Sequence, residues 1–290
     1  MTRKTKIVAT IGPATSSREM LEELIKRGVN VCRLNFSHGV HDDHKQVVEN
    51  IRSLDEELGT HTAILADLQG PKLRVGKMEE GTELVEGSTF KLVNREMIGN
   101  AKEAYMNYSK LPKDVKIGEL ILLDDGKLML EVTATNMTDE VTTTVKVGGV
   151  LSSNKGVNLP NTDISLPSLT DKDNEDLLYA LELGVDWVGL SFVRSARDII
   201  ELKHVIKNQH SQARVVAKIE KPQAIEDIDD IVTSTDAVMV ARGDLGVELP
   251  MEQVPILQKK IVQACLTHAK PVIIATQMME SMIENPVPTR

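Results

Sequence analysis

Charged side chains capable of chemistry stand at the ends of two short apolar runs, RVVAKIE and DAVMVARGDLG: Lys218, Glu220, Arg242 and Asp244. Each run has the length of one strand buried on both faces. In a parallel α/β barrel, catalytic groups occupy the carboxyl ends of the strands. Carboxylates are hard oxygen ligands for Mg²⁺ or Mn²⁺, and a bound divalent ion can carry phosphoryl and enolate oxygens. The pattern therefore indicates chemistry at one mouth of a barrel.

The composition is that of a soluble globular protein. Of the 290 residues, 41% are hydrophobic and 27% are charged, which is ordinary for this class. A net charge of −9 and 2% aromatic residues argue against a nucleic-acid partner. No run approaches the roughly 20 apolar residues of a membrane span. Two cysteines, Cys32 and Cys265, are too few for a disulfide framework. We therefore expect a cytoplasmic protein with no membrane or nucleic-acid partner.

Strand and helix patterns alternate along most of the chain. The segment 16–28 predicts a helix, with N-caps at Ser16–Ser17 and a C-cap at Gly28. Alternation at this spacing predicts a parallel sheet with right-handed crossovers. The predicted strands are apolar runs that end in a polar tip: Lys6–Ile11, Asn30–Phe36, Thr62–Leu68, Val185–Phe192, Arg214–Glu220, Asp236–Ala241 and Pro271–Gln277.

One interval, from Gly70 to about Pro160, lacks a helical period. It consists of short alternating runs separated by Gly and Asp-Gly turn signals. We predict a small antiparallel β domain over residues 71–159, inserted after the third strand, where it can serve as a lid. The segments before and after this insert carry the alternation of strands and helices.

The number of strands bears on barrel closure. A closed TIM-type barrel takes eight strands and about 250 residues, whereas the pattern predicts seven strands. An unclosed sheet would expose the backbone edges of its first and seventh strands, which a second copy could cover. We therefore expect the chain to be a piece or a natural truncation of a longer protein, and turnover by the isolated chain is an open question.

Nine short motifs follow one another along the chain: KIVATIGPAT, VCRLNFSHG, ADLQGPKLR, LDDGKLML, NKGVNLP, GLSFVRS, VVAKIEK, VMVARGDLGVE and IIATQMMESM. In these motifs and their order the chain resembles the pyruvate kinase family, from about residue 4 to its end. The resemblance implies a TIM-type A domain, residues 1–70 and 160–290, interrupted by a mobile β-barrel B domain. The family normally continues with an eighth strand and a C-terminal domain that carries allosteric and tetramer contacts, so the full-length form is implied to be a homo-oligomer.

The resemblance implies phosphoryl transfer from phosphoenolpyruvate to ADP, giving pyruvate and ATP. By resemblance, Glu220 and Asp244 hold Mg²⁺ or Mn²⁺, and Lys218 faces the transferring phosphoryl group. Arg33 matches the arginine whose planar fork grips the phosphate. The backbone at Gly243 and Asp244, where a short helix is expected to start, is implied to bind the substrate carboxylate.

The remaining positions also rest on the resemblance. Thr276 matches a threonine that orients the carboxylate and the water network that protonates the enolate, and Glu280 follows it. The monovalent-cation ligands, usually of K⁺, match Asn35, Ser37, Asp67 and the carbonyl of Leu68. The positions that face the nucleotide match Asn35, His38, Arg74 and Lys155, and the turn Asp124–Asp125 can meet the barrel when the lid closes.

One position departs from the family pattern. Many members read GPEIR where this chain reads GPKLR, so Lys72 replaces an acidic residue beside the cation site. An ammonium there can stand in for K⁺, and we expect catalysis that is largely independent of K⁺.

Two alternatives stay open. The first is a non-catalytic binding or assembly module that retains affinity for substrate and metal. The second is a Mg²⁺-dependent lyase that cleaves carbon–carbon bonds through the same enolate chemistry. The insert with Lys155 favours a nucleotide-using enzyme, because an aldolase needs no lid for ADP. Fold alone does not decide among the three.

Overall fold

The computed structural model describes residues 3–289, which form two compact units. The first unit contains the residues up to Gly70, Ser168–Ala241 and the residues from Lys259 onward; the second contains Pro71–Pro167 and Arg242–Gln258. The domain boundaries expected from the sequence, 1–70 with 160–290 and 71–159, stay a prediction. Residues 1, 2 and 290, at the ends of the expected barrel domain, lie outside the described residues.

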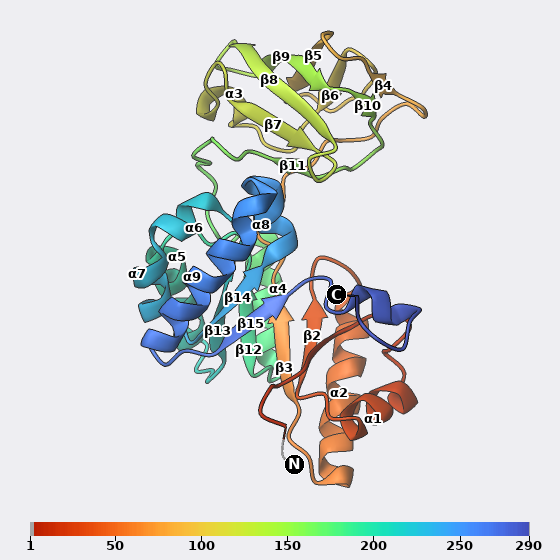
Figure 1. Cartoon of the computed structure of the whole chain (residues 1–290), viewed down its shortest axis with the longest axis vertical. Helices are drawn as coiled ribbons and strands as arrows, with labels where there is room; N and C mark the ends of the chain where they lie inside the picture. Colours follow the sequence, from red (N-terminus) through yellow and green to blue (C-terminus); the bar gives the residue numbers. More distant parts are fainter. Residues whose placement is uncertain (1–2, 290) are drawn as a thin grey trace. The chain divides into compact units, whose positions relative to one another are not determined.

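The first unit is built on a parallel sheet that curls as part of a barrel. Within residues 3–289 its seven strands are adjacent in chain order, and every pair is parallel. All predicted strands are present, each a little shorter than expected, so the prediction of an incomplete TIM-type sheet is confirmed. Their arrowheads lie together at one end (Figure 1). The strands are β1 (Val8–Ile11), β2 (Val31–Asn35), β3 (Ala63–Asp67), β12 (Trp187–Leu190), β13 (Arg214–Ile219), β14 (Ala237–Ala241) and β15 (Val272–Ala275).

Helices separate most of these strands. The first begins as expected, because the Ser17 side chain accepts a hydrogen bond from the amide of Met20, and Gly28 follows its end with a φ of +93°. None of the helices within residues 3–289 combines the length and the apolar character that crossing a membrane needs. They are α1 (Arg18–Lys26), α2 (His41–Leu58), α4 (Asp171–Glu182), α5 (Ala196–Asn208), α6 (Pro222–Glu226), α7 (Ile228–Ser234), α9 (Val254–Thr267) and the 3-10 helix η2 (Glu280–Ile283).

The two faces of the sheet bury different sets of side chains because successive residues of a strand point in opposite directions. In β13, Val215 and Ala217 join the large core that the helices cover. Val216 lies on the other face, in a small cluster with Leu65 and Met239. The residues of β13 with even numbers therefore face the inside of the curled sheet. The next of these after Val216 is the charged residue Lys218.

The second unit contains the β structure expected between the third and fourth strands of the barrel. A six-stranded sheet has the order β11-β7-β8-β9-β5-β6, and β4 pairs with β10 (Figure 1). The pairs are antiparallel except β5 with β6, which is parallel, so the sheet is mixed. The strands are β4 (Glu83–Leu84), β5 (Thr89–Val93), β6 (Glu103–Tyr105), β7 (Leu120–Leu123), β8 (Leu128–Thr135), β9 (Glu140–Val147), β10 (Gly149–Val150) and β11 (Val157–Asn158).

This unit also contains helical turns that the alternating pattern did not predict. One turn of helix, α3 (Leu111–Asp114), interrupts the strands, and its residues Leu111 and Pro112 are buried. A short amphipathic turn leaves no helical period long enough to detect in the sequence. Outside the insert, α8 (Arg242–Glu248) and the 3-10 helix η1 (Met251–Gln253) are grouped with the same unit.

Candidate active site

Charged side chains, most of them buried, gather near the carboxyl ends of β2, β3 and β13, all in the first unit. Arg33 lies on β2, Asp67 ends β3, and Lys218 lies near the end of β13, followed by Glu220. Strand alternation places Lys218 and Glu220 on the same inner face as Val216. A glycine at position 189 of β12 makes room for the carboxylate, because a Cβ there would lie 3.0 Å from Asp67 Oδ1.

The ammonium of Lys218 is at the centre of this cluster. Its Nζ lies 3.0 Å from Glu220 Oε1 and 3.1 Å from Asp67 Oδ1, and it donates a hydrogen bond of 2.6 Å to Ser191 Oγ. Asp67 and Glu220 are each only 1% exposed and Lys218 is 8% exposed. Charges this deeply buried persist only when they are paired, and here one cation stands between two carboxylates.

The environment keeps Lys218 charged. Burial by itself would lower the pKa of the ammonium, but the carboxylates of Glu220 and Asp67 outweigh burial and raise that pKa above its usual value. Lys218 is therefore protonated throughout the physiological range and presents a fixed positive charge.

Arg33 adds a second cation to the cluster. Its Nε donates a hydrogen bond of 2.6 Å to Asp67 Oδ2, and another nitrogen of the guanidinium lies 2.5 Å from the same oxygen. The third nitrogen donates to Thr10 Oγ1 on β1, at 2.9 Å. These contacts hold the planar guanidinium in one orientation, while 23% of the side chain stays exposed and accessible to a ligand.

Ser191 and Phe192 are site residues that the sequence reasoning missed. Ser191 Oγ accepts from Lys218 and donates a hydrogen bond of 2.7 Å to the carbonyl of Leu68. The amide of Phe192 donates to Glu220 Oε2 at 2.7 Å, and its φ of +54° is unusual for a non-glycine residue. Both residues belong to the motif GLSFVRS, and this motif was the signal in the sequence that could have pointed to them. Nothing within the motif, however, links it to Lys218.

The donor set of this cluster fits bound cations. Asp67 Oδ1 makes an ion pair with Lys218 but accepts no hydrogen bond from the described residues. Glu220 contributes carboxylate oxygens of the kind that Mg²⁺ and Mn²⁺ prefer. Among residues 3–289 no group of three or more His, Cys, Asp and Glu side chains has the arrangement of a metal site. Mg²⁺ commonly takes only one or two protein carboxylates and completes its shell with water and substrate oxygens.

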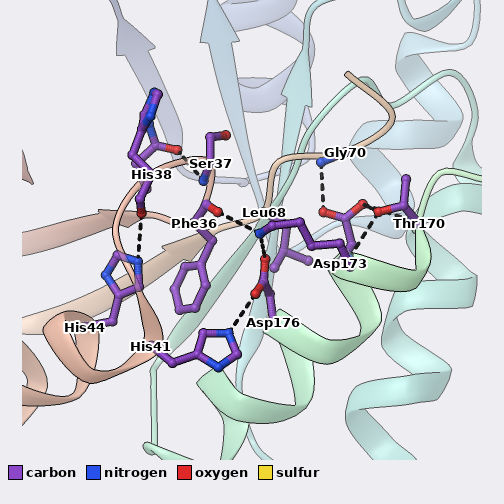
Figure 2. A network of polar contacts seen from close by, with 12 residues as sticks. Phe36, Ser37, His38, His41, His44, Leu68, Gly70, Thr170, Asp173 and Asp176 are labelled. Carbon is purple, nitrogen blue, oxygen red and sulfur yellow. Dashed lines mark hydrogen bonds and ion pairs between the residues drawn. The ribbon is translucent and has the colours of Figure 1, made fainter. Parts of the chain in front are cut away.

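The predicted ligands of the monovalent cation lie in and beside the turn after β2. Asn35 pairs in register with Asp67 across the β2–β3 ladder. Asn35 Oδ1 accepts a hydrogen bond of 3.1 Å from the amide of Ser37, and the amide of Phe36 donates to the carbonyl of Asp67 at 3.0 Å. His38 follows and is exposed (Figure 2). The structure therefore brings Asn35, Ser37 and Asp67 together from two strands.

In the second unit, pairing of β7 with β11 brings distant residues together. Lys155 Nζ lies 2.8 Å from Asp124 Oδ1, and Arg74 donates to the carbonyl of Asn154 at 2.9 Å. The hydrogen bond from Lys155, with a further one from Lys127, holds the pKa of Asp124 below its usual range. Two of the predicted nucleotide residues, Arg74 and Lys155, thus belong to one surface region of this unit.

The remaining predicted residues have the following positions. Gly243 and Asp244 are the second and third residues of α8, so the expected short helix is present and begins at Arg242. Thr276 directly follows β15 with a φ of +72° and is exposed, as is Glu280 in η2. Lys72 belongs to the second unit and is partly buried.

Comparison with known proteins shows the family of the chain. The family model described as "Pyruvate kinase, barrel domain" matches residues 2–290. A pyruvate kinase of Mycobacterium intracellulare is 47% identical over 291 residues, which cover all of this chain and 61% of that protein. The pyruvate kinase of Thermotoga maritima is 48% identical over 99% of this chain and 62% of its own length, and that of Geobacillus stearothermophilus is 45% identical over half of its length. The chain thus spans about three fifths or less of these relatives, and it belongs to the pyruvate kinase family.

Proposed function

We propose that this chain provides the phosphoryl-transfer site of a pyruvate kinase, which moves the phosphoryl group of phosphoenolpyruvate to ADP and leaves pyruvate and ATP. The observation that carries the proposal is the buried cluster in which Lys218 contacts Asp67, Glu220 and Ser191 at one end of the sheet. An inert scaffold gains little from burying three charged groups together, since their desolvation often outweighs their attraction. A site that must neutralise phosphate and enolate oxygens needs such a cluster.

The residues of the cluster take separate roles in the proposal. The fork of Arg33 binds the phosphate, with its plane set by Asp67 and Thr10. The ammonium of Lys218 offsets the charge that grows on the transferring group and on the enolate oxygen. Thr276 orients the water network that delivers a proton to the enolate carbon, so that the enolate becomes pyruvate.

Glu220 and Asp244 are the residues that we assign to a divalent ion, Mg²⁺ or Mn²⁺. When bound, such an ion supplies Lewis-acid stabilisation of phosphoryl and enolate oxygens. Arg74, Lys155, His38 and Asn35 are assigned to the nucleotide, and the backbone of Gly243 to the substrate carboxylate. We further propose a homo-oligomer in the full-length form, located in the cytoplasm.

A coupled assay with lactate dehydrogenase and NADH tests the proposed function. We expect pyruvate formation that requires phosphoenolpyruvate, ADP and a divalent ion together, because the reaction must bring all three sets of charges into line. Calorimetry with phosphoenolpyruvate and Mg²⁺ is run in parallel. Binding without turnover would favour a non-catalytic binding module, pyruvate formed from a different carbon skeleton without ADP would favour the lyase, and no binding would refute the assignment altogether.

The dependence on K⁺ provides a separate prediction. Lys72 carries an ammonium where many family members carry an acidic residue, so we expect activity in Tris or Na⁺ buffer to change less than about threefold when K⁺ is added. The substitution Lys72→Glu is expected to make activity depend on K⁺. Lys77→Glu, at an exposed position five residues further on, is the matched control and should leave the K⁺ response unaltered. A large K⁺ requirement in the unaltered protein would refute the proposal that the Lys72 ammonium stands in for K⁺.

A further inference from the structure

The first turns of α4 hold the two loops that leave the carboxyl ends of β2 and β3. The helix begins with a capping box, in which Thr170 Oγ1 accepts from the amide of Asp173 at 3.1 Å and Asp173 Oδ2 accepts from the amide of Thr170 at 2.9 Å. The other oxygen of Asp173 accepts a hydrogen bond of 2.9 Å from the amide of Gly70. Asp173 is completely buried. Its hydrogen bonds join α4 to the loop after β3 (Figure 2).

Lys172 joins the same helix to the loop after β2. Its Nζ donates a hydrogen bond of 3.0 Å to the carbonyl of Phe36 and a second one to Asp176 Oδ2. The side chain of Asp176 is only 5% exposed, and its other oxygen lies 2.8 Å from Nε2 of His41. The ring of His41 stacks on Tyr179, at 4.1 Å between centroids and an angle of 7°. The position of the Lys172 ammonium is therefore set by a buried carboxylate that is itself held from the far side.

The turn Phe36–Gly39 lies beyond β2, where contacts with side chains add to the few backbone hydrogen bonds of the turn. His44 donates from Nε2 to the carbonyl of His38 at 3.1 Å, and its ring stacks on Phe36 at 4.3 Å. Burial lowers the pKa of His44, which favours the neutral ring. The carbonyl of Phe36 is thus held by Lys172, and the carbonyl of His38 is held by His44 (Figure 2).

We propose that Lys172, oriented by Asp176, is a positioning residue that fixes the Phe36–Gly39 turn so that His38 can bind the phosphates of a nucleoside diphosphate. This proposal rests on the proposed function. Arg33 and Lys218, which are assigned to phosphoenolpyruvate, need no such support, because they lie within strands whose backbones are paired on both sides. Loss of Lys172 should therefore weaken the binding of the nucleotide and leave the binding of phosphoenolpyruvate unchanged.

The test replaces Lys172 by methionine, which keeps the length of the side chain and removes its charge and donor. Lys26→Met is the matched control, since Lys26 also pairs with an acid one turn away, Glu22, on the exposed face of α1. We expect amide hydrogen exchange at Ser37 and His38 to quicken about tenfold or more in Lys172→Met, the effect of losing a hydrogen bond to a charged donor. Exchange at Leu34 within β2 should stay as it is in the unaltered protein.

Ligand binding is measured by calorimetry on the same proteins. In Lys172→Met we expect the Kd of Mg²⁺–ADP to rise about tenfold, while the Kd of phosphoenolpyruvate with Mg²⁺ changes less than twofold. Lys172→Arg, which retains a charged donor, should recover most of the nucleotide affinity. If Lys172 had a purely structural role, its loss would weaken the binding of both ligands or of neither. Lys172→Arg would then not restore the nucleotide affinity selectively.

Two results would overturn the proposal. One is unchanged exchange at Ser37 and His38 in Lys172→Met; the other is a loosened turn with an unchanged Kd for Mg²⁺–ADP. If the unaltered protein binds neither phosphoenolpyruvate nor ADP, the proposed function fails, and the exchange comparison still decides whether Lys172 holds the turn. Failure of the function and failure of the positioning role are therefore distinguishable.

Discussion

Replacement of Lys218 by methionine is expected to lower kcat for phosphoryl transfer by about 10²- to 10³-fold, the usual effect of losing one preorganised charge at the reacting group. Lys218 lies between two carboxylates and is held charged by them. Methionine retains the aliphatic volume but cannot offset negative charge on the transferring group. The loss should appear mainly in kcat, because the charge matters most in the transition state. Steady-state kinetics with the coupled assay measures both constants.

The same substitution should also destabilise the protein. Removing one partner of a buried ion pair costs about 3–5 kcal/mol, and here Asp67 and Glu220 would lose the ammonium they share. Unfolding by denaturant must therefore accompany the kinetics, at a temperature where the variant is folded. Lys203→Met is the control, since Lys203 pairs with Asp236 at 2.8 Å outside the cluster. A folded Lys218→Met protein with kcat within tenfold of the unaltered one would contradict the assigned role.

The second large effect is expected from Glu220→Gln, which removes one charge and preserves the shape of the side chain. The glutamine carbonyl can still accept the hydrogen bond from the amide of Phe192, so local packing should persist. Binding of Mn²⁺ in the presence of oxalate should weaken about a hundredfold or more, because partners outside the first ligand shell alone contribute 10- to 100-fold. Electron paramagnetic resonance of free Mn²⁺ measures this affinity without relying on turnover.

A nearby acid provides the comparison for Glu220→Gln. Glu226 lies in α6, six residues further on, and is exposed, so Glu226→Gln should bind Mn²⁺ as the unaltered protein does. The Glu220→Gln variant should also lower the pKa of Lys218, since one of the carboxylates that raise it is lost. Equal Mn²⁺ affinity in both variants would show that Glu220 is not a metal ligand.

Much of the sheet was predictable because its signals are local. A strand buried on both faces appears in the sequence as a short apolar run, and each run here ended in polar residues where a parallel strand meets its loop. The ends were less predictable: β15 stops at Ala275, and the next residue, Thr276, has a positive φ that the apolar pattern does not encode. The one-turn helix α3 was missed because it is too short to show a helical period, and the apolar pattern does not encode the parallel direction of the pair β5–β6.

Individual site residues could be named from motifs, but their partners could not. Lys218 and Glu220 are close in the chain. Asp67 and Ser191 are far from Lys218 in the chain and lie beside it only because β3, β12 and β13 are neighbours in the folded sheet. Lys172 and Asp176 form an ordinary i,i+4 pair of a surface helix in the sequence. Only the fold shows that this carboxylate is buried and that the lysine reaches the carbonyl of Phe36.

The order and type of the barrel strands, the position of the β insert and the kinds of charged groups at the strand ends were thus contained in the chain itself, because they follow from local apolar patterning and residue chemistry. The fold alone decided which carboxylates share the Lys218 ammonium and which helix holds the turn of Ser37 and His38. Those contacts join residues far apart in the chain, and their strength depends on burial, which lowers the local dielectric only after the sheet and its helices have packed.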